Sequence, residues 1–216
     1  MSMTAERYEE DDMLMPTPPV PAEGLTVAVF DFDSTLVKGD SLWPFLVAVA
    51  GWPQAIVSLL AALLRLTFRL RSRTDARTYI KDQLLWMVLA GQRESDLARA
   101  VARMRRWPRW IAPSLRALKE HYAAGHHIVI ASGGLDIYLP ALLKNVPYHA
   151  LICTEMEVVN GTVTGRSSTG NCVRASKAAR VARYLKSLGP LEDSWAYGNL
   201  PHDLPMMRLV QHRVIV

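Results

Sequence analysis

The sequence predicts an α/β protein with a Rossmann-like, doubly wound parallel sheet and a helical insert after the first strand. Short apolar runs rich in β-branched residues are typical of strands buried on both faces, and four occur, at 25–30, 127–131, 194–197 and 213–216. Helical patterns separate them, chiefly at 110–124 and 176–188. Alternation of buried strands with helices is the pattern of a doubly wound sheet.

Residues 40–109 contain no convincing strand pattern and predict a helical insert. The strongly apolar stretch 41–70 contains Pro44 and Pro53, which we expect to break it, and 79–90 is a further helical stretch. The predicted division of the chain is a disordered tail at 1–24, an α/β core at 25–39 and 110–216, and a helical cap at 40–109.

Two shorter segments have patterns of their own. Prolines recur between residues 16 and 21 and remove backbone donors that a helix or a central strand needs, so we expect the tail to be mobile. Residues 154–166 consist of two β-rich runs around Asn160-Gly161, which is a strong signal for a hairpin.

The composition fits a globular protein of the cytoplasm. Half of the 216 residues are hydrophobic and 21% are charged, which excludes wholesale disorder. Cys153 and Cys172 are too few for a disulfide framework; they suit a reducing compartment and predict small buried side chains. The acidic N-terminal segment does not resemble a secretory signal.

Two carboxylates directly follow the first predicted strand. Ligands of an open parallel sheet bind at the carboxyl ends of its strands, and residues i and i+2 of an extended segment share a side, so Asp31 and Asp33 can face one pocket. Neighbouring carboxylates repel each other unless a cation or a shared proton intervenes. One can then attack phosphorus while the other transfers protons. If this pair is considered alone, a catalytic site and an ordinary turn after a strand are equally good interpretations.

Further polar groups follow the later strands. Ser132 and Gly133 end the second strand, where a hydroxyl and backbone N–H groups can bind a phosphate. Lys177 lies at the start of a predicted helix and can neutralise a phosphoryl oxygen. Asn199 and Asp203 follow the third strand and offer oxygen ligands suited to Mg²⁺. Taken singly, each has an ordinary alternative as a turn or surface residue.

Together these residues form four ordered motifs: Asp31-x-Asp33-x-Thr35, Ser132-Gly133-Gly134, Lys177 and Gly198-Asn199-x-x-x-Asp203. Their order resembles the haloacid dehalogenase (HAD) superfamily of hydrolases, in particular its phosphoserine-phosphatase-like branch, subfamily IB. The resemblance covers about residue 26 to the end. It implies a Mg²⁺-dependent phosphatase that forms an aspartyl-phosphate.

The resemblance also implies a role for each motif residue. Asp31 is the nucleophile and a metal ligand, and Asp33 is the general acid/base, whose backbone carbonyl also contacts the metal. The other implied roles are phosphoryl binding by Ser132, Gly133 and Lys177, and completion of the metal site by Asn199 and Asp203. Two positions depart from the family pattern: Asn199 stands where Asp is more frequent, and Ser34 where glycine is common.

Within that branch, the sequence is similar to phosphatidylglycerophosphate phosphatases at residues 40–46, 155–158, 160–166 and 170–172. A lipid phosphate is therefore one implied substrate. Residues 55–71 are apolar early and cationic late, which fits a helix at the inner membrane surface and equally a cap helix packed in its own core.

Two alternative functions stay open. The first is a phosphatase of a small soluble phosphomonoester, such as phosphoserine, and the second is a catalytically weak binding module, which only Asn199 suggests. The net charge of +5 is concentrated between residues 53 and 120, with fourteen Lys and Arg against five Asp and Glu. We expect no nucleic-acid partner, because these basic residues lack a recognised reading motif.

Overall fold

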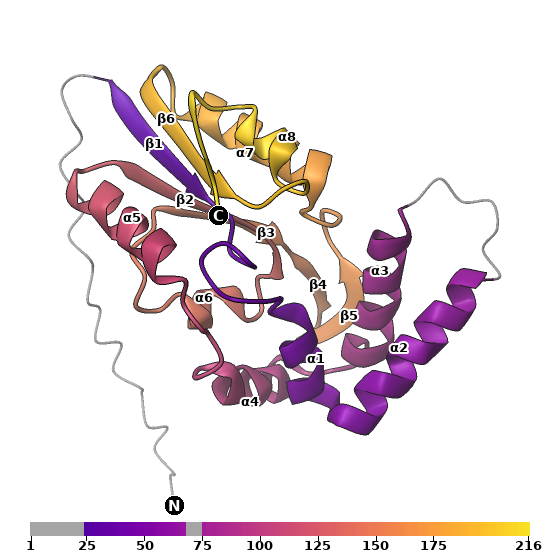
Figure 1. Ribbon diagram of the computed structural model, residues 1–216. Coiled ribbons are helices and arrows are strands. Elements are labelled where there is room, and N and C mark those ends of the chain that lie inside the picture. Colours follow the sequence, from indigo (N-terminus) through magenta and orange to yellow (C-terminus); the bar gives the residue numbers. More distant parts are fainter. Residues whose placement is uncertain (1–23, 68–74) are drawn as a thin grey trace, which may run out of the picture.

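A five-stranded parallel sheet forms the centre of the molecule (Figure 1). The computed structural model describes residues 24–67 and 75–216, so the predicted tail lies outside the described residues except for Gly24. In the order β3–β2–β1–β6–β7, the strands are β3 (Ala150–Thr154), β2 (His127–Leu135), β1 (Leu25–Phe30), β6 (Leu191–Gly198) and β7 (His212–Ile215).

The sheet is covered on both faces, as the doubly wound pattern predicts. Alternate residues of β1 point in opposite directions, so Phe30 packs in one hydrophobic cluster and Val29 in the other. Helices α5 (Ala112–Ala123) and α6 (Leu139–Leu142) contribute to the cluster of Phe30. Helices α7 (Arg174–Ser187) and α8 (Leu204–Met207) contribute to the cluster of Val29. The predicted fold class is therefore confirmed.

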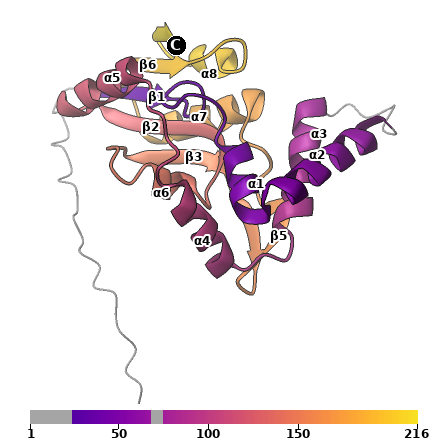
Figure 2. The same ribbon diagram turned by 60° about the horizontal axis from the view of Figure 1, so that its bottom comes forward.

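Five helices lie between β1 and β2 in the chain, and the first four of them gather beyond one end of the sheet (Figure 2). They are α1 (Leu42–Ala50), α2 (Trp52–Thr67), α3 (Ala76–Leu89) and α4 (Glu94–Met104). The expected break at Pro53 is confirmed, because α1 ends at Ala50 and Pro53 is the second residue of α2, with Gly51 between the helices at φ +78°. The expected break at Pro44 is wrong, because Pro44 lies in the first turn of α1, where a backbone N–H has no partner within the helix.

The predicted hairpin is confirmed as β4 (Met156–Val159) and β5 (Thr162–Ser167). Its turn residues Asn160 and Gly161 both have positive φ, as a tight hairpin turn of the mirror-image type requires. The hairpin contacts the inserted helices, since the N–H of Gly91 donates to the carbonyl of Val163 at 2.9 Å. The four-helix insert and the hairpin therefore form one layer.

Several elements differ from the sequence prediction. Strand β3 and the short helices α6 and α8 were not predicted, because each is only four or five residues long and has no periodic signal. Helix α5 begins at Ala112, because Trp110 instead pairs with Val37 in an isolated bridge. Helix α7 begins two residues earlier than predicted, at Arg174.

The contact between the hairpin and α3 requires a glycine at position 165. A Cβ there would lie 2.7 Å from the Cα of Trp86, and Gly165 has φ +79°. We expect Gly165→Ala to lower the free energy of unfolding by about 2–4 kcal/mol, because it adds overpacking to a left-handed backbone. Gly189→Ala is the matched control, since Gly189 has φ +87° but nothing within 4 Å. Urea denaturation should show that the control loses about 1 kcal/mol of unfolding free energy. Equal losses in the two variants would contradict the packing argument.

Candidate active site

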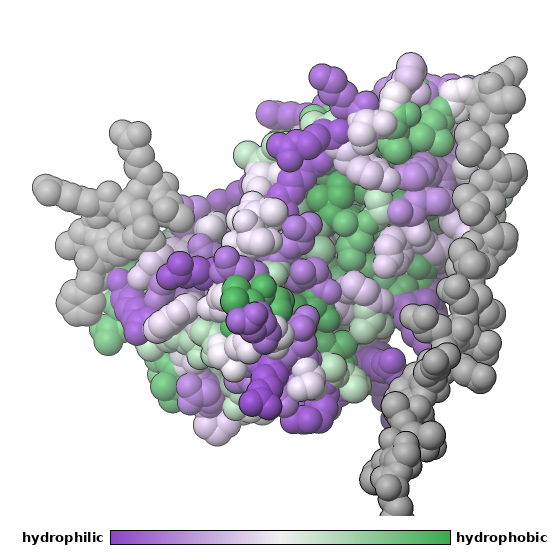
Figure 3. Space-filling view, turned by 180° about the vertical axis from the view of Figure 1, so that it is seen from behind, coloured by the Kyte–Doolittle hydropathy of each residue, from purple (hydrophilic) through white to green (hydrophobic). Residues whose placement is uncertain are grey.

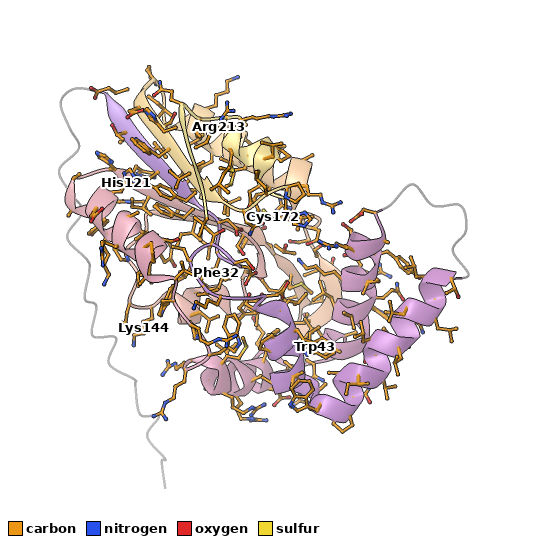
Figure 4. All side chains as sticks on the ribbon, viewed as in Figure 1. Phe32, Trp43, His121, Lys144, Cys172 and Arg213 are labelled. Atoms are coloured by element: carbon orange, nitrogen blue, oxygen red, sulfur yellow. The ribbon has the colours of Figure 1, made fainter. Side chains whose placement is uncertain are left out.

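A cavity of about 350 Å³ opens at the carboxyl ends of β1 and β6, next to α3. The switch in strand order beside β1, where the chain first adds β2 and later β6, is the usual ligand position in such sheets. Figure 4 shows Phe32, in the loop after β1, and Cys172, in the loop before α7, toward the middle of the molecule. The predicted residues that line the cavity are Asp31, Asp33, Gly133, Lys177, Asn199 and Asp203.

Asp31 is buried at the end of β1 and has two side-chain partners. Its Oδ1 accepts a hydrogen bond from Nζ of Lys177 at 2.6 Å, and its Oδ2 accepts one from the hydroxyl of Thr35 at 2.9 Å. Burial raises the pKa of Asp31, and the positive charge of Lys177 opposes that shift. The short ion pair favours the carboxylate form, which is the form that can act as a nucleophile.

Lys177 joins two carboxylates that come from different strands. Its Nζ lies 2.6 Å from Oδ1 of Asp31 and 2.8 Å from Oδ1 of Asp203, and all three side chains are buried. Burial alone lowers the pKa of Lys177, but the charges of Asp31 and Asp203 outweigh it and raise the pKa above its usual value. Lys177 is the fourth residue of α7, so the first turn of that helix delivers the ammonium to the sheet edge.

Asp33 faces the cavity in a different environment from Asp31. Its Oδ1 accepts a hydrogen bond from the backbone N–H of Ser41 at 2.8 Å. Burial and then the negative charges of Asp40 and Asp31 raise the pKa of Asp33 to about 7. The two carboxyl groups of the motif therefore differ in their hydrogen-bond partners, an ammonium for Asp31 and a backbone N–H for Asp33, and such different environments are typical of a nucleophile beside a general acid.

Asn199 and Asp203 lie on the loop after β6. The N–H of Asn199 donates to Oδ2 of Asp203 at 3.0 Å, and the side-chain amide of Asn199 donates to the backbone carbonyl of Asp33 at 3.2 Å. Gly198 is required beside them, since a Cβ there would lie 2.7 Å from Cβ of Asp203. This loop thus connects the end of β6 to the loop after β1.

The structure places Ser132 beside the cavity but not among its lining residues. Ser132 is fully buried within β2, and its hydroxyl accepts a hydrogen bond from the N–H of Gly134 at 2.9 Å. Gly133, the next residue, does line the cavity. The loop therefore offers backbone groups at the surface of the cavity and keeps the hydroxyl behind them.

The oxygen atoms expected to hold a metal are close to one another. Asp31 and Asp203 share the ammonium of Lys177, and the amide of Asn199 contacts the backbone carbonyl of Asp33. Carboxylate, amide and carbonyl oxygens are ligands that Mg²⁺ accepts. Residues 24–67 and 75–216 contain no group of three or more His, Cys, Asp or Glu side chains that could hold a metal. A Mg²⁺ site here would therefore depend on the neutral oxygens as well as on the two carboxylates.

The cavity residues that were not predicted as site residues include Lys81 of α3 and Asn171 of the loop before α7. The Nζ of Lys81 donates to the side-chain oxygen of Asn171 and to the carbonyl of Gly133. Burial lowers the pKa of Lys81 to about 8, although Asp40 and Asp33 oppose that shift. No local pattern distinguishes Lys81, because the polar residues Asp82 and Gln83 follow it directly, whereas Asn171 was noted as part of the similarity at 170–172.

Two further contacts join the start of α3 to the core at the cavity mouth. Asp75 forms an ion pair with Arg174 at 3.0 Å, and Arg77 contacts the ring of His202 at 2.8 Å. Both pairs cross from the insert to loops of the core. They fix the position of α3 over the cavity.

Comparisons with known proteins find a curated relative, solved structures of similar fold and a family model that matches the chain. A phosphoserine phosphatase from Streptomyces coelicolor is 29% identical over 185 residues, which is 84% of this chain; the chain spans 41% of that relative's length. A solved structure of a protein of unknown function from Bordetella pertussis Tohama I has a TM-score of 0.72 at 21% identity, and covers 89% of this chain and 90% of its own.

A solved structure described as a phospho-aspartyl intermediate analogue of phosphoserine phosphatase has a TM-score of 0.61 at 17% identity, and the match covers 89% of this chain and 87% of that chain. At such identities these two structures show a shared fold. The family model for haloacid dehalogenase-like hydrolases matches residues 28–208, which include every predicted site residue. Since this match spans most of the chain, the protein belongs to the haloacid dehalogenase-like hydrolase family.

Proposed function

We propose that the protein is a Mg²⁺-dependent phosphomonoester phosphatase that acts through an aspartyl-phosphate on Asp31. The observation that carries this proposal is the buried ammonium of Lys177 between Asp31 and Asp203, at the carboxyl edge of a parallel sheet. Membership of a hydrolase family and the similarity to a phosphoserine phosphatase support it. In this proposal residues 25–39 and 110–216 form the core, and residues 40–109 form the cap.

The proposed reaction has two steps. A carboxylate oxygen of Asp31 attacks phosphorus, the bond from phosphorus to the ester oxygen breaks, and Asp33 gives its proton to the departing alcohol. Asp33 then accepts a proton from water as the water attacks the phosphoryl group, and phosphate leaves with Asp31 restored. The raised pKa of Asp33 fits a group that holds a proton near neutral pH.

Phosphoryl binding in this scheme depends on Lys177 and on the loop of Ser132 and Gly133. The ammonium neutralises negative charge, and the backbone N–H of Gly133, a residue that lines the cavity, would donate to a phosphoryl oxygen. Asp31, Asp203, the carbonyl of Asp33 and the amide oxygen of Asn199 would hold Mg²⁺, which would offset the charge of substrate and nucleophile when bound. Phosphoryl transfer mainly requires this positioning and charge neutralisation.

Asp31→Asn should abolish phosphate release, because an amide is not a nucleophile and leaves Lys177 with one carboxylate. We expect a loss of more than about 10³-fold in kcat. The assay measures Mg²⁺-dependent phosphate release from lipid phosphates, such as phosphatidylglycerophosphate, and from soluble monoesters, such as phosphoserine. Asp96→Asn, at an exposed surface position, is the control. Equal activity of both variants would contradict the role of Asp31, and a folded wild type inactive on every substrate would favour the binding-module alternative.

Asn199→Asp should lower the Mg²⁺ concentration needed for half-maximal activity by about tenfold, which corresponds to ~1.4 kcal/mol. The physical reason is the extra negative charge beside the carbonyl of Asp33, which Asn199 contacts. Magnesium titration of activity, together with calorimetric binding of the metal, measures the change. Asn145→Asp, at an exposed site, controls for net charge. An unchanged Mg²⁺ requirement in Asn199→Asp would remove Asn199 from the ligand set.

We further propose a lipid phosphate as the substrate class and contact of the cap with the membrane surface. The observation that favours it is that α2 turns its larger apolar side chains toward solvent, the reverse of the usual arrangement of a helix on a core. This helix buries its small residues Ala55, Ser58 and Ala62 and exposes large apolar ones. The exposed residues follow the helix at intervals of four, and therefore share one face: Trp52, Ile56, Leu60 and Leu64, which are 61%, 45%, 60% and 60% exposed.

A lipid surface fits this stripe by chemistry. Helix α2 contains no acidic residue, and Arg65 near its end stacks on Trp86, itself exposed on α3. Apolar side chains with a flanking cation match the acyl and anionic headgroup layers of a bilayer. The face seen from behind has several hydrophobic patches among hydrophilic residues (Figure 3).

The proposed location is the cytoplasm, peripheral to the inner face of the membrane. The buried free thiols of Cys153 and Cys172 suit a reducing compartment. Among the described residues no single helix meets the length and hydropathy criteria for a membrane span; α1 and α2 meet them only as a pair bent by 120°. A soluble phosphomonoester, such as phosphoserine, is the alternative substrate class.

Leu60→Gln with Leu64→Gln should weaken binding to vesicles that contain phosphatidylglycerol by more than tenfold, because two leucines lose about 1.5–3 kcal/mol each of apolar transfer. Vesicle sedimentation measures the binding, with phosphatidylcholine vesicles for comparison. Leu209→Gln, exposed on the core, is the matched control. Equal binding by all three proteins would contradict the membrane proposal. Loss of a dimer by the double variant in ultracentrifugation, without vesicle binding by the wild type, would assign the stripe to a second copy.

A further inference from the structure

Helices α2 and α3 lie side by side (Figure 1), and two further cavities open along their contact. One, of about 350 Å³, is lined mainly by apolar side chains of the two helices. The other, of about 500 Å³, is lined mainly by polar and charged side chains of α2, α3 and β5. Neither cavity shares a lining residue with the candidate active site.

The two cavities follow one another along a single groove. On α2, Val57 and Ala61 line the apolar cavity and Arg65 lines the polar one, and residues four positions apart share one face of a helix. On α3, Ala90 lines the apolar cavity, and Trp86, four residues earlier, lines both. The groove is therefore apolar at one end and polar at the other.

The groove is accessible to a ligand from solvent. Val57 at the apolar end is 57% exposed, and Trp86, where the two cavities meet, is 47% exposed. Arg65 and Arg166 at the polar end are also exposed. The groups that a ligand would contact thus lie on the surface of the cap.

The polar end has more positive than negative charge. Arg65 and Arg166 line it together with one acidic residue, Asp82. Nη1 of Arg65 donates to Oε1 of Gln83 at 2.9 Å, and its guanidinium carbon lies 5.6 Å from the ring centre of Trp86, so this side chain is held in place. The guanidinium of Arg166 has no ion pair or hydrogen bond within the described part of the chain. Its free N–H groups suit a phosphate oxyanion.

An amphiphile with an anionic head matches this order of surfaces. A free phosphate would leave the apolar end of the groove unused, and an uncharged chain would leave Arg166 without a partner. The groove also adjoins the exposed stripe of α2, since Val57 directly follows Ile56 and Ala61 directly follows Leu60. A bilayer in contact with the stripe would therefore lie beside the groove.

We infer that the groove between α2 and α3 binds one anionic phospholipid, with an acyl chain against Val57 and Ala61 and the phosphate between Arg65 and Arg166. The site lies outside the candidate active site, so the lipid bound there is a ligand of the cap and not a substrate. The inference rests on the proposed contact of the cap with a membrane, which supplies the lipid, and not on the phosphatase reaction.

Calorimetric titration with monomeric dihexanoyl phosphatidylglycerol tests the polar end. Dihexanoyl phosphatidylcholine has the same chains and no net charge, and both are phosphodiesters, which a monoester phosphatase does not consume. We expect the wild type to bind the anionic lipid about tenfold more tightly. Arg166→Gln should abolish this preference, and Arg166→Lys should retain part of it. Arg183→Gln, at an exposed position of α7, is the matched control and should keep the wild-type preference.

The apolar end is tested with the same two lipids. Val57→Gln should weaken the binding of both by about tenfold, because a polar side chain replaces an apolar contact with the chain. Val216→Gln, 41% exposed on the core, is the control. Equal wild-type affinity for the two lipids, a preference that survives in Arg166→Gln, or undiminished binding by Val57→Gln overturns the inference.

Phosphate release from soluble monoesters by the same variants separates this inference from the proposed function. Arg166→Gln should keep the wild-type kcat, because Arg166 lies outside the candidate active site. A wild type that binds the anionic lipid but hydrolyses no monoester would contradict the phosphatase and support the groove. Hydrolysis without a preference for the anionic lipid would contradict the groove alone. Because the lipid is monomeric, vesicle binding by the stripe does not enter this measurement.

Discussion

The buried ammonium of Lys177 is the interaction on which the site depends. Asp31 arrives at the end of β1, and Asp203 arrives on the loop after β6. Two carboxylates this close would repel each other in a buried site, and removing one member of a buried ion pair costs about 3–5 kcal/mol. The helix that carries Lys177 packs on the face of the sheet that includes Val29, so the same packing that builds the core also places the ammonium.

The cap depends on this core through polar contacts at the cavity and apolar contacts away from it. The ion pair of Asp75 with Arg174 is exposed, so water and salt screen it. The network of Lys81 is less exposed and reaches the backbone of Gly133 directly. A movement of α3 would therefore first displace Gly133, to which the proposal assigns phosphate binding. The carbonyl of Gly133 thus couples the position of α3 to the geometry of the proposed phosphate-binding segment.

The sequence predicted the helices and strands whose apolar residues follow a clear pattern, and the site residues that belong to a recognisable motif. The strands β1, β2 and β6 and the polar groups that follow them have such signals, because buried parallel strands read as continuous apolar runs. Strand β3 and the contacts of Lys81 have none. Their partners lie far away in the chain, as with Lys81 and Asn171, and no local pattern encodes a contact across ninety positions. Ser34 shows the converse: its φ of +60° explains why glycine is common at that position in related enzymes.

Helices α2 and α3 give the cap two surfaces with different chemistry. Helix α2 packs on α3 through small residues such as Ala55 and Ala62, which lets the two helices approach closely. Helix α3 lines the cavity with Lys81 and Arg77, while α2 presents the stripe that includes Leu60 on the outside. The layer between a bilayer surface and the cavity would thus be only two helices thick. A lipid whose phosphate must reach Asp31 while its acyl chains stay in the membrane needs a short path of this kind, which a thick polar cap would not provide.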